Sequence, residues 1–230
     1  MFFKELFNWT ENKKIYSYSE NKKNDQLIKE LIVDGISDKK ILSVIKKIPR
    51  KFFVDKHSID NAYKNNALCT DCGQTISQPY VVAYMIESLK LKNTDRILEI
   101  GTGTGWQTAI LANLCREVFT IERFNNLLDK AKKNISRFNI KNVNYKLGNG
   151  FEGWGEKILF DSIIISAASK MIPPILFKNL KPNGNLIFPK KYLSGNQKLL
   201  LIKKNDRNYF DQKELLDVKF VPLINDKSIR

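Results

Sequence analysis

Three alternating glycines carry the clearest chemical signal. Gly101, Gly103 and Gly105 follow a short apolar stretch and precede an apolar helical pattern. Glycine lets the backbone approach a ligand closely, and the helix start beyond it offers free N–H groups. A dinucleotide-binding turn reads G-x-G-x-x-G, whereas here the third glycine comes one residue early. The spacing suits a ligand without a pyrophosphate, although a tight strand–helix turn without any ligand also wants glycines.

A carboxylate stands where such a ligand would need one. Glu122 ends the next predicted strand, the place from which an acidic side chain binds the hydroxyls of a ribose. Together with the helix, this acid and the turn predict a nucleoside-cofactor site. The predicted cofactor-binding residues here are Gly101, Thr102, Gly103, Gly105 and Glu122.

Cysteine and histidine offer little for metal or redox chemistry. Cys69 and Cys72 form a Cys-x-x-Cys pair, but no second pair accompanies them and His57 is the only histidine. A four-ligand zinc site is therefore not expected. The pair also lacks the helix start of a thioredoxin-like unit. Three cysteines, with Cys115, are too few for a disulfide framework, so we predict a reduced, cytoplasmic protein without a metal.

The elements that must position the site alternate between strands and helices. Strands alternating with helices predict βαβ units and a mostly parallel sheet, so the predicted fold class is α/β with a doubly wound, Rossmann-like sheet. Helices are predicted from Pro79 to Leu89, through Leu114, and at 125–138 and 174–180. Strands are predicted at 96–100, 117–121, 143–147, 160–166, 184–188, 199–203 and 219–221.

The chain before this core is expected to form an arm and a cap. Helical spacing of apolar residues appears before Asp34-Gly35 and again before Pro49, with Ser37 or Asp38 as the N-cap of the second helix. The predicted division is a polar N-terminal arm (1–24), a helical cap with a substrate and cofactor loop (25–78), and an α/β core (79–230).

The charge is strongly basic, at 39 Lys+Arg against 24 Asp+Glu and a formal net charge of +15. The lysines are scattered in pairs, and no strip gathers arginines with interleaved aromatics, which base stacking favours. Net charge alone acts on solubility and non-specific attraction, so no specific nucleic-acid partner is predicted. Neither an apolar run of about 18 residues nor a leader-like start is present, so no membrane span or signal peptide is expected.

The ordered motifs resemble one enzyme family. The E-x-G-x-G-x-G turn and its acid look like those of class I S-adenosylmethionine-dependent methyltransferases. The segment 73–80, GQTISQPY, narrows the resemblance to the protein-L-isoaspartate O-methyltransferase family. It implies a class I methyltransferase sheet with an N-terminal helical extension, S-adenosyl-L-methionine as cofactor, and coverage of about residues 25–224. Other matching segments are IPRKFFV at 48–54, FDSII at 160–164, SAA at 166–168, LKPNG at 180–184 and FVPL at 220–223.

The reaction implied is methyl transfer to the free α-carboxylate of an L-isoaspartyl residue in a damaged protein. The ester then cyclises to a succinimide. A carboxylate with a pKa of about 3.9 is already ionised at neutral pH, so no general base is needed. The protein must supply alignment and partial desolvation of the nucleophile. Isoaspartyl proteins and peptides are the implied partners, and a monomer is expected for a chain of this size.

Ser77 is the predicted catalytic and substrate-binding residue. Its hydroxyl can donate to a carboxylate oxygen, and the family's active-site serine falls at this position. The alternative is that Ser77 caps the helix that begins at Pro79. The resemblance implies that Gln74, Thr75, Ile76 and Ser77 itself also bind the cofactor, although Thr75 equally fits a loop hydroxyl.

Two residues depart from the family pattern. Asn149, before Gly150, stands where the family usually has an aspartate that accepts a hydrogen bond from the adenine amino group. Both remain predicted cofactor-binding residues, with binding weakened by about 1 kcal/mol, and the alternative is an ordinary Asn-Gly turn. Asp71 precedes the GQTIS segment, where its charge is expected to repel a substrate carboxylate.

The remaining predicted site residues each have a plain structural alternative. Glu99 is predicted to accept hydrogen bonds from the backbone or the cofactor amine, or else to be a buried strand-end carboxylate. Ala168 is predicted to admit a substrate backbone, or to serve packing. Val221, Pro222 and Leu223 resemble the family's C-terminal substrate wall, or they form an edge strand.

Two other functions compete with protein repair. A nucleic-acid methyltransferase would need a motif such as Asn/Asp-Pro-Pro-Tyr/Phe after the fourth strand, where Ser166-Ala167-Ala168-Ser169 stands instead. A non-catalytic binder of isoaspartyl sites or of a partner protein stays open because of Asn149 and Asp71.

Overall fold

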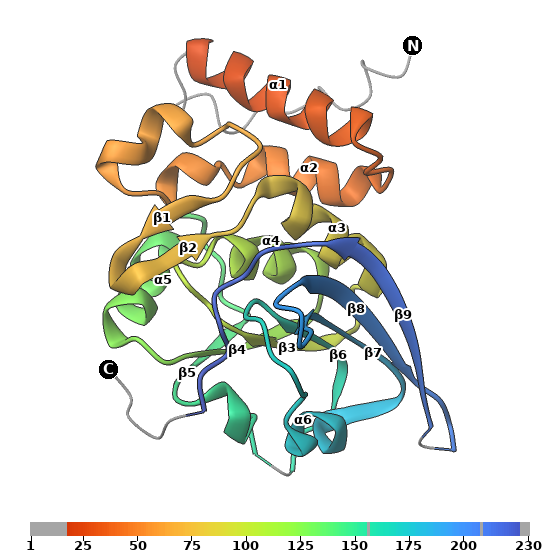
Figure 1. The fold of residues 1–230 in the computed structure, drawn as a ribbon. Helices are drawn as coiled ribbons and strands as arrows, with labels where there is room; N and C mark the ends of the chain where they lie inside the picture. The colour runs from red at the N-terminus through yellow and green to blue at the C-terminus, as the bar shows by residue number, and fades with distance from the viewer. Residues whose placement is uncertain (1–17, 156, 208, 226–230) are drawn as a thin grey trace.

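A computed structural model describes residues 18–155, 157–207 and 209–225. Residues 1–17 of the predicted arm lie outside the described residues. A seven-stranded sheet forms the lower half of the molecule in Figure 1, and most of the helices lie above it. The sheet strands are β3 (Arg96–Ile100), β4 (Glu117–Glu122), β5 (Val143–Leu147), β6 (Phe160–Ile165), β7 (Leu180–Lys191), β8 (Gln197–Lys204) and β9 (Phe210–Asp217). The α-helices are α1 (Tyr18–Val33), α2 (Lys39–Lys47), α3 (Pro79–Leu89), α4 (Trp106–Leu114), α5 (Asn125–Ser136) and α6 (Pro174–Asn179).

The strand order is β5-β4-β3-β6-β7-β8-β9, with the first five strands parallel and β8 and β9 antiparallel to their neighbours. The chain reverses its direction of travel across the sheet between β3 and β6. Ligands of open α/β sheets bind at the carboxyl ends of the strands at such a switch point. The predicted α/β class and its doubly wound sheet are confirmed.

Alternating side chains give the sheet two apolar faces. In β3, Ile97 packs into a core shared with α1 to α5, whereas Leu98 and Ile100 pack into a second core with α6. Successive side chains of a strand point to opposite faces of the sheet, and Glu99 lies between Leu98 and Ile100. It therefore points to the same face as Ile97, the face covered by α1 to α5. This places a carboxylate directly beneath α4.

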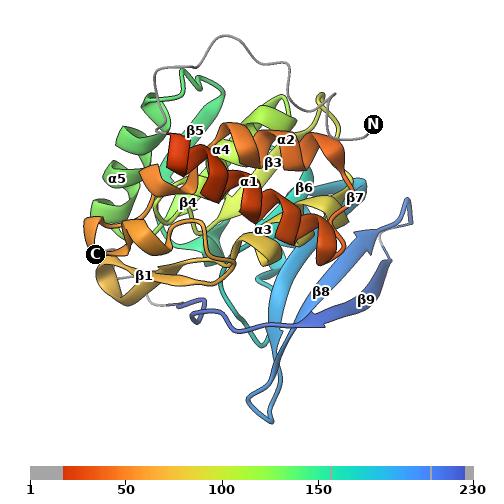
Figure 2. The same cartoon turned by 90° about the horizontal axis from the view of Figure 1, so that it is seen from above.

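The predicted cap is present. Asp38 is the N-cap of α2, since its side chain accepts hydrogen bonds from the N–H groups of Lys40 (2.8 Å) and Ile41 (3.2 Å). Figure 2 shows α1 lying across α2 and α3. The indole of Trp106 donates to the carbonyl of Ile48 at 2.9 Å, which ties the start of α4 to the cap.

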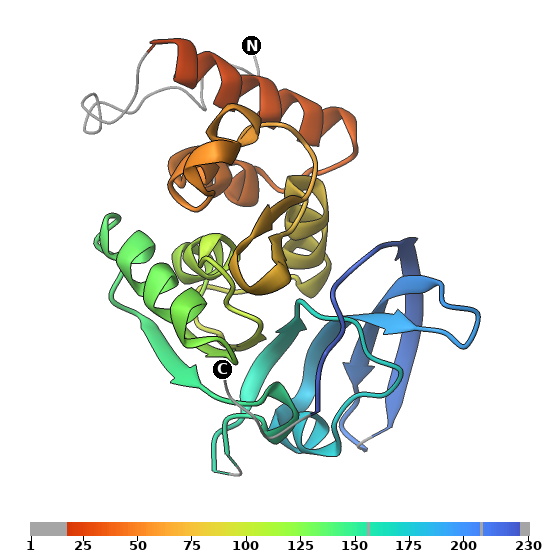
Figure 3. The ribbon, with the colours of Figure 1, turned by 60° about the vertical axis from the view of Figure 1, so that its left-hand side comes forward.

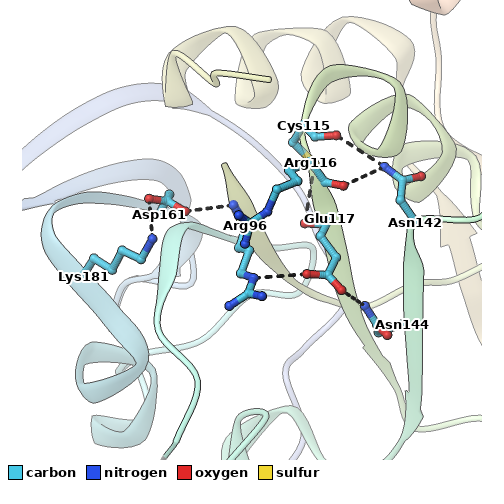
Figure 4. A network of polar contacts seen from close by, with 8 residues as sticks. All are labelled: Arg96, Cys115, Arg116, Glu117, Asn142, Asn144, Asp161 and Lys181. Carbon is cyan, nitrogen blue, oxygen red and sulfur yellow. Dashed lines mark hydrogen bonds and ion pairs between the residues drawn. The ribbon is translucent and has the colours of Figure 1, made fainter. Parts of the chain in front are cut away.

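A polar network closes the amino ends of the central strands, opposite the switch point. The Arg96 side chain donates to Glu117 at 3.1 Å, and Glu117 accepts from Asn144 at 2.9 Å, so β3, β4 and β5 are joined (Figure 4). Asp161 accepts from the Arg96 backbone and from Lys181, both at 2.8 Å. These contacts stabilise the register of the strands. They lie at the opposite end of the strands from the carboxyl ends, where a ligand would bind.

Three predictions of local structure need correction. Helix α1 begins at Tyr18, inside the predicted arm 1–24. The predicted strand 219–221 is wrong, because these residues belong to no strand and only the next residue, Pro222, forms an isolated bridge, with Ala168. Strand β9 was not predicted, because it is an exposed edge strand of mostly polar residues and so lacks an apolar signal.

Candidate active site

The glycine turn has the backbone that its sequence predicts. Gly101, Gly103 and Gly105 have φ angles of 96°, 55° and 94°, a region that L side chains rarely adopt. A Cβ on Gly105 would come within 3.0 Å of Ala131 and Ile135 of α5. A Cβ on Gly103 would meet no atom within 4 Å. Gly105 therefore serves packing, whereas Gly103 borders open space that a ligand can occupy.

Glu122 holds this turn from the end of β4. One carboxylate oxygen accepts from the Gly103 N–H at 2.8 Å, and the other accepts from the N–H groups of Arg123 (2.8 Å) and Phe124 (3.1 Å). Burial raises the pKa of Glu122, and these backbone hydrogen bonds oppose the rise. The oxygen that accepts from Gly103 keeps a lone pair for a ligand hydroxyl, whereas the other oxygen already accepts two hydrogen bonds. The place predicted for a ribose-binding acid is thus occupied by a carboxylate at the wall of a hollow.

Two hollows meet over the glycine turn and form one cleft, which we call the cofactor cleft. The first is lined by the glycine turn and Gln74, Thr75, Ile76 and Ser77. The second is more apolar, with Ile121, Phe124 and Leu223 beside Asn149 and Gly150. The residues that line both hollows are Gln74, Gly101, Glu122, Ser166 and Val221.

The hairpin of β1 (Leu68–Thr70) and β2 (Gln74–Ile76) delivers Ser77 to the cleft. Figure 3 shows this hairpin between the cap helices and the central sheet. Ser77 is half-buried and lines the first hollow. The alternative that it caps α3 is wrong, because Gln78 is the N-cap and makes no side-chain capping bond.

Arg50 fixes the backbone at Ser77, a role that the sequence did not reveal. The guanidinium is 1% exposed and donates to the carbonyls of Ser77 (3.0 Å) and Ile76 (3.3 Å). It also donates to three carbonyls of the preceding loop, those of Ala62 (3.2 Å), Lys64 (3.4 Å) and Asn66 (2.9 Å). Burial lowers the pKa of Arg50 to about 9. One cation therefore joins the loop 62–66 to the segment that carries Ser77.

The predicted substrate wall is assembled across the cleft. The Ala168 N–H donates to the Val221 carbonyl, and the Leu223 N–H donates to the Ala168 carbonyl, both at 2.7 Å. After β9 the chain crosses back over the sheet toward β4 and β5 (Figure 1). Val221, Pro222 and Leu223 all line the second hollow, so the alternative of an edge strand is wrong.

Comparisons with known proteins agree with this geometry. The family model described as "Protein-L-isoaspartate(D-aspartate) O-methyltransferase (PCMT)" matches residues 21–228. The chain belongs to this family. It is 46% identical to a protein-L-isoaspartate O-methyltransferase of Nitrobacter winogradskyi, over 83% of this chain and 87% of the relative. It is 42% identical to one of Vibrio vulnificus, over 89% of this chain and 97% of the relative.

A solved structure agrees as well. A Plasmodium falciparum crystal structure, described as a β-aspartate methyltransferase (PCMT) in complex with S-adenosyl-L-homocysteine, is 26% identical with a TM-score of 0.77. The match covers 88% of this chain and 99% of that chain. The predicted family and its class I methyltransferase fold are confirmed.

The first departure from the protein-L-isoaspartate O-methyltransferase pattern is Asn149. Its side-chain carbonyl accepts from the Phe151 N–H at 2.9 Å and so caps a one-turn helix, Gly150–Glu152. A Cβ on Gly150 would overlap the Ile100 side chain, so this position requires glycine. Asn149 is thus both a capping residue and a wall residue of the second hollow.

The second departure, Asp71, is balanced by a cation that the sequence pattern did not reveal. Lys130 of α5 binds Asp71 at 2.8 Å and also binds Asp55. Burial alone would lower the pKa of Lys130, but the hydrogen bonds and charges of the two aspartates raise it. Lys130 offsets part of the charge of the two aspartates, and Asp71 lines neither hollow, while its expected repulsion of a substrate carboxylate stays a prediction.

Glu99 requires a correction too. It is fully buried and does not line the cleft. It accepts from Gln107 (3.0 Å), Thr108 (2.5 Å) and Thr120 (2.7 Å), while burial raises its pKa to about 7. Of its two predicted roles, the buried strand-end carboxylate is the correct one, although its donors are side chains. It supports the cleft through Gln107, which does line it.

The Cys-x-x-Cys pair forms no metal site. Among the described residues, no cluster of three or more histidine, cysteine, aspartate or glutamate side chains could hold a metal ion. Cys69 and Cys72 are exposed free cysteines, whereas Cys115 is buried, which raises its pKa to about 12. Within the same residues, no helix is long and apolar enough to cross a membrane.

Proposed function

We propose that this chain transfers a methyl group from S-adenosyl-L-methionine to the α-carboxylate of L-isoaspartyl residues in damaged proteins. The observation that carries the proposal is the position of Ser77. Arg50 holds its backbone, and the hairpin brings it to the first hollow beside the glycine turn. A hydroxyl donor and a nucleoside-type turn therefore share one cleft.

The residues of the cleft fit the cofactor. Gly103 borders open space, Glu122 offers one carboxylate oxygen for the ribose, and Asn149 offers a carbonyl to the adenine amino group. Ile121 and Phe124 give the second hollow apolar walls for a flat base. When bound, S-adenosylmethionine supplies a methyl group on a positively charged sulfur. Gln74, Thr75, Ile76 and Ser77 close the cleft over that end.

The methyl transfer requires that the substrate carboxylate be oriented, and it requires no general base. The substrate carboxylate is ionised at neutral pH, so its oxygen is already nucleophilic. Ser77 donates to one oxygen and holds it in line, which lowers the entropic part of the barrier. Ala168 is buried and holds the segment 221–223 through two backbone hydrogen bonds, and that segment lines the second hollow and gives the peptide a wall. A backbone amide nitrogen of the substrate then attacks the methyl ester and expels methanol, and hydrolysis of the resulting succinimide returns part of the product to normal aspartate.

We also propose a cytoplasmic monomer without a specific nucleic-acid partner. The two exposed thiols, Cys69 and Cys72, support a reducing location. The segment 166–169 lacks the acceptor-activating motif of a nucleic-acid methyltransferase. Light scattering after size exclusion would test the monomer, and methylation assays on RNA and DNA would test the partner.

The deciding assay is methyl transfer from labelled S-adenosylmethionine to an isoaspartyl peptide, with the matching aspartyl peptide as control. Product is scored as base-labile methanol, which reports esters and not N-methyl groups. Transfer to the isoaspartyl peptide alone is the expected result. Binding of the cofactor without transfer to either peptide would instead support a non-catalytic isoaspartyl binder.

A further inference from the structure

A chain of side-chain hydrogen bonds runs from a buried carboxylate to the wall of the cofactor cleft. Glu99 accepts from Gln107 Nε2 at 3.0 Å, and the same nitrogen donates to the Ser166 hydroxyl oxygen at 2.9 Å. Thr108 and Thr120 supply the other donors to Glu99. These hydrogen bonds thus join β3, α4 and the residue after β6.

This series of hydrogen bonds determines which atoms carry the hydrogens. An ionised carboxylate only accepts, so the amide of Gln107 must turn its NH₂ group toward Glu99. The second hydrogen of that group then points to Ser166, whose oxygen must accept it. A serine hydroxyl has a single hydrogen of its own. In the part of the chain that the structure describes, that hydrogen is not given to any protein acceptor, so Ser166 is set to donate to a ligand.

The Ser166 hydroxyl lies where a substrate would need it. Its N–H is bound to the Ile100 carbonyl at 2.9 Å, which fixes it at the switch point of the sheet. Its Cβ would lie 3.4 Å from a Cβ on Gly101. Ser166 lines both hollows, and it shares the first with Ser77. The hairpin and the sheet therefore each present one hydroxyl to the same cleft.

We propose that Ser166 is a second substrate-binding hydroxyl, which donates to the isoaspartyl α-carboxylate while Ser77 binds its other oxygen. Gln107 and Glu99 are positioning residues, since they act only through Ser166. This inference rests on the proposed function. A carboxylate is the shared chemistry of two candidate ligands, the substrate and the amino-acid end of the cofactor. The substrate is favoured because Ser166 lines the first hollow together with Ser77 and the second together with the segment 221–223.

The test compares Ser166→Ala, Ser166→Thr and Gln107→Met with the wild type at about pH 8, where Glu99 is ionised. Ser169→Ala is the matched control, because its hydroxyl bonds to the Met171 carbonyl and it lines neither hollow. KM and kcat are measured with an isoaspartyl peptide. The Kd of S-adenosylhomocysteine, which has the cofactor's carboxylate but no reactive methyl, is measured by calorimetry.

Because a hydrogen bond to a charged group is lost, Ser166→Ala should lower kcat/KM by about 10- to 100-fold. The loss should fall chiefly on KM, and the S-adenosylhomocysteine Kd should stay within about twofold of the wild type. Ser166→Thr should restore most of the activity, Gln107→Met should lose less than Ser166→Ala, and Ser169→Ala should match the wild type.

Three results would overturn the inference. A weaker S-adenosylhomocysteine Kd with an unchanged peptide KM would assign the hydroxyl to the cofactor. Wild-type constants for a folded Ser166→Ala, checked by thermal melting, would leave it without a ligand role. Equal losses in Ser166→Ala and Ser166→Thr would indicate packing instead. Failure of the proposed function is distinct, because the wild type and Ser169→Ala would then both fail to methylate the isoaspartyl peptide.

Discussion

At the scale of single residues, the proposed mechanism depends first on the hydroxyl of Ser77. Ser77→Ala removes one hydrogen bond to a charged oxygen, so kcat/KM for an isoaspartyl peptide should fall by about 10- to 100-fold. The Kd of S-adenosylhomocysteine should change little, because the backbone at Ser77 stays bound to Arg50. Ser88→Ala is the control, since its hydroxyl bonds within α3 to the Tyr84 carbonyl. Equal activity of the two variants would argue against a role of Ser77 in catalysis.

At Asn149 we expect a substitution that strengthens ligand binding, in contrast to the loss of activity expected at Ser77. Its single carbonyl oxygen caps the Phe151 N–H, so a ligand must share that oxygen. Asn149→Asp provides a second oxygen with a charge, and the S-adenosylhomocysteine Kd should fall about fivefold, or about 1 kcal/mol. Calorimetry with this neutral-sulfur ligand separates the hydrogen bond from attraction to a sulfonium. Asn139→Asp, at a turn after α5, adds the same charge elsewhere; an equal gain there would refute the adenine contact.

The residue scale also shows what a sequence can and cannot reveal. The glycine turn was predictable because its spacing follows directly from local backbone geometry. The partner of Asp71 was not, because Lys130 is 59 residues away along the chain. Glu99 was placed correctly beneath the turn, but its donors come from α4 and β4, which only packing brings together.

At the scale of elements, Arg50 is the contact that joins the cap to the active-site hairpin. Arg50→Lys keeps the charge but cannot reach five carbonyls, because an ammonium has three donors and no fork. Buried carbonyls left without a donor cost about 1–3 kcal/mol each, so the free energy of unfolding should fall by at least about 2 kcal/mol. The peptide kcat/KM should fall further than stability alone explains, because Ser77 loses its anchor.

Urea unfolding and steady-state kinetics would check this prediction. Arg137→Lys is the matched control, as an exposed arginine that stacks on Phe52. An Arg50→Lys enzyme with wild-type stability and kinetics would show that the loop 62–66 and the hairpin hold Ser77 without the guanidinium.

Elements also differ in how well they could be predicted from their sequences. Strands β3, β4 and β6 are apolar and buried, so composition alone identified them. Strand β9 is exposed along most of its length and is held by pairing with β8, a long-range effect that hydrophobic patterning does not record. The segment 221–223 looks like a strand, but it pairs with a single residue, Ala168, and becomes a wall of the cleft instead.

At the scale of the whole molecule, two polar layers lie at opposite ends of the sheet and have different tasks. The Arg96–Glu117–Asn144 network joins β3, β4 and β5 at their amino ends, away from the cofactor cleft at their carboxyl ends (Figure 4). The layer at the carboxyl ends is built from Glu99 and Glu122, two buried carboxylates whose pKa values burial raises. Burying such groups costs stability, as is common where a fold keeps polar groups ready for a ligand.

This cost should be visible in the pH dependence of stability. Burial raises the pKa of Glu99 from its ordinary value of 4.5 to about 7, so the folded chain binds a proton more tightly than the unfolded chain. The stability contributed by that proton is fully present below about pH 4.5 and is lost as the pH rises through about 7. Glu99→Gln cannot titrate. The difference in unfolding free energy, wild type minus Glu99→Gln, should therefore fall by up to about 3 kcal/mol between about pH 5 and pH 8. Urea titrations of both proteins across this range measure it. A difference that stays flat would mean that the hydrogen bonds from Gln107, Thr108 and Thr120 fully offset the burial of the charge.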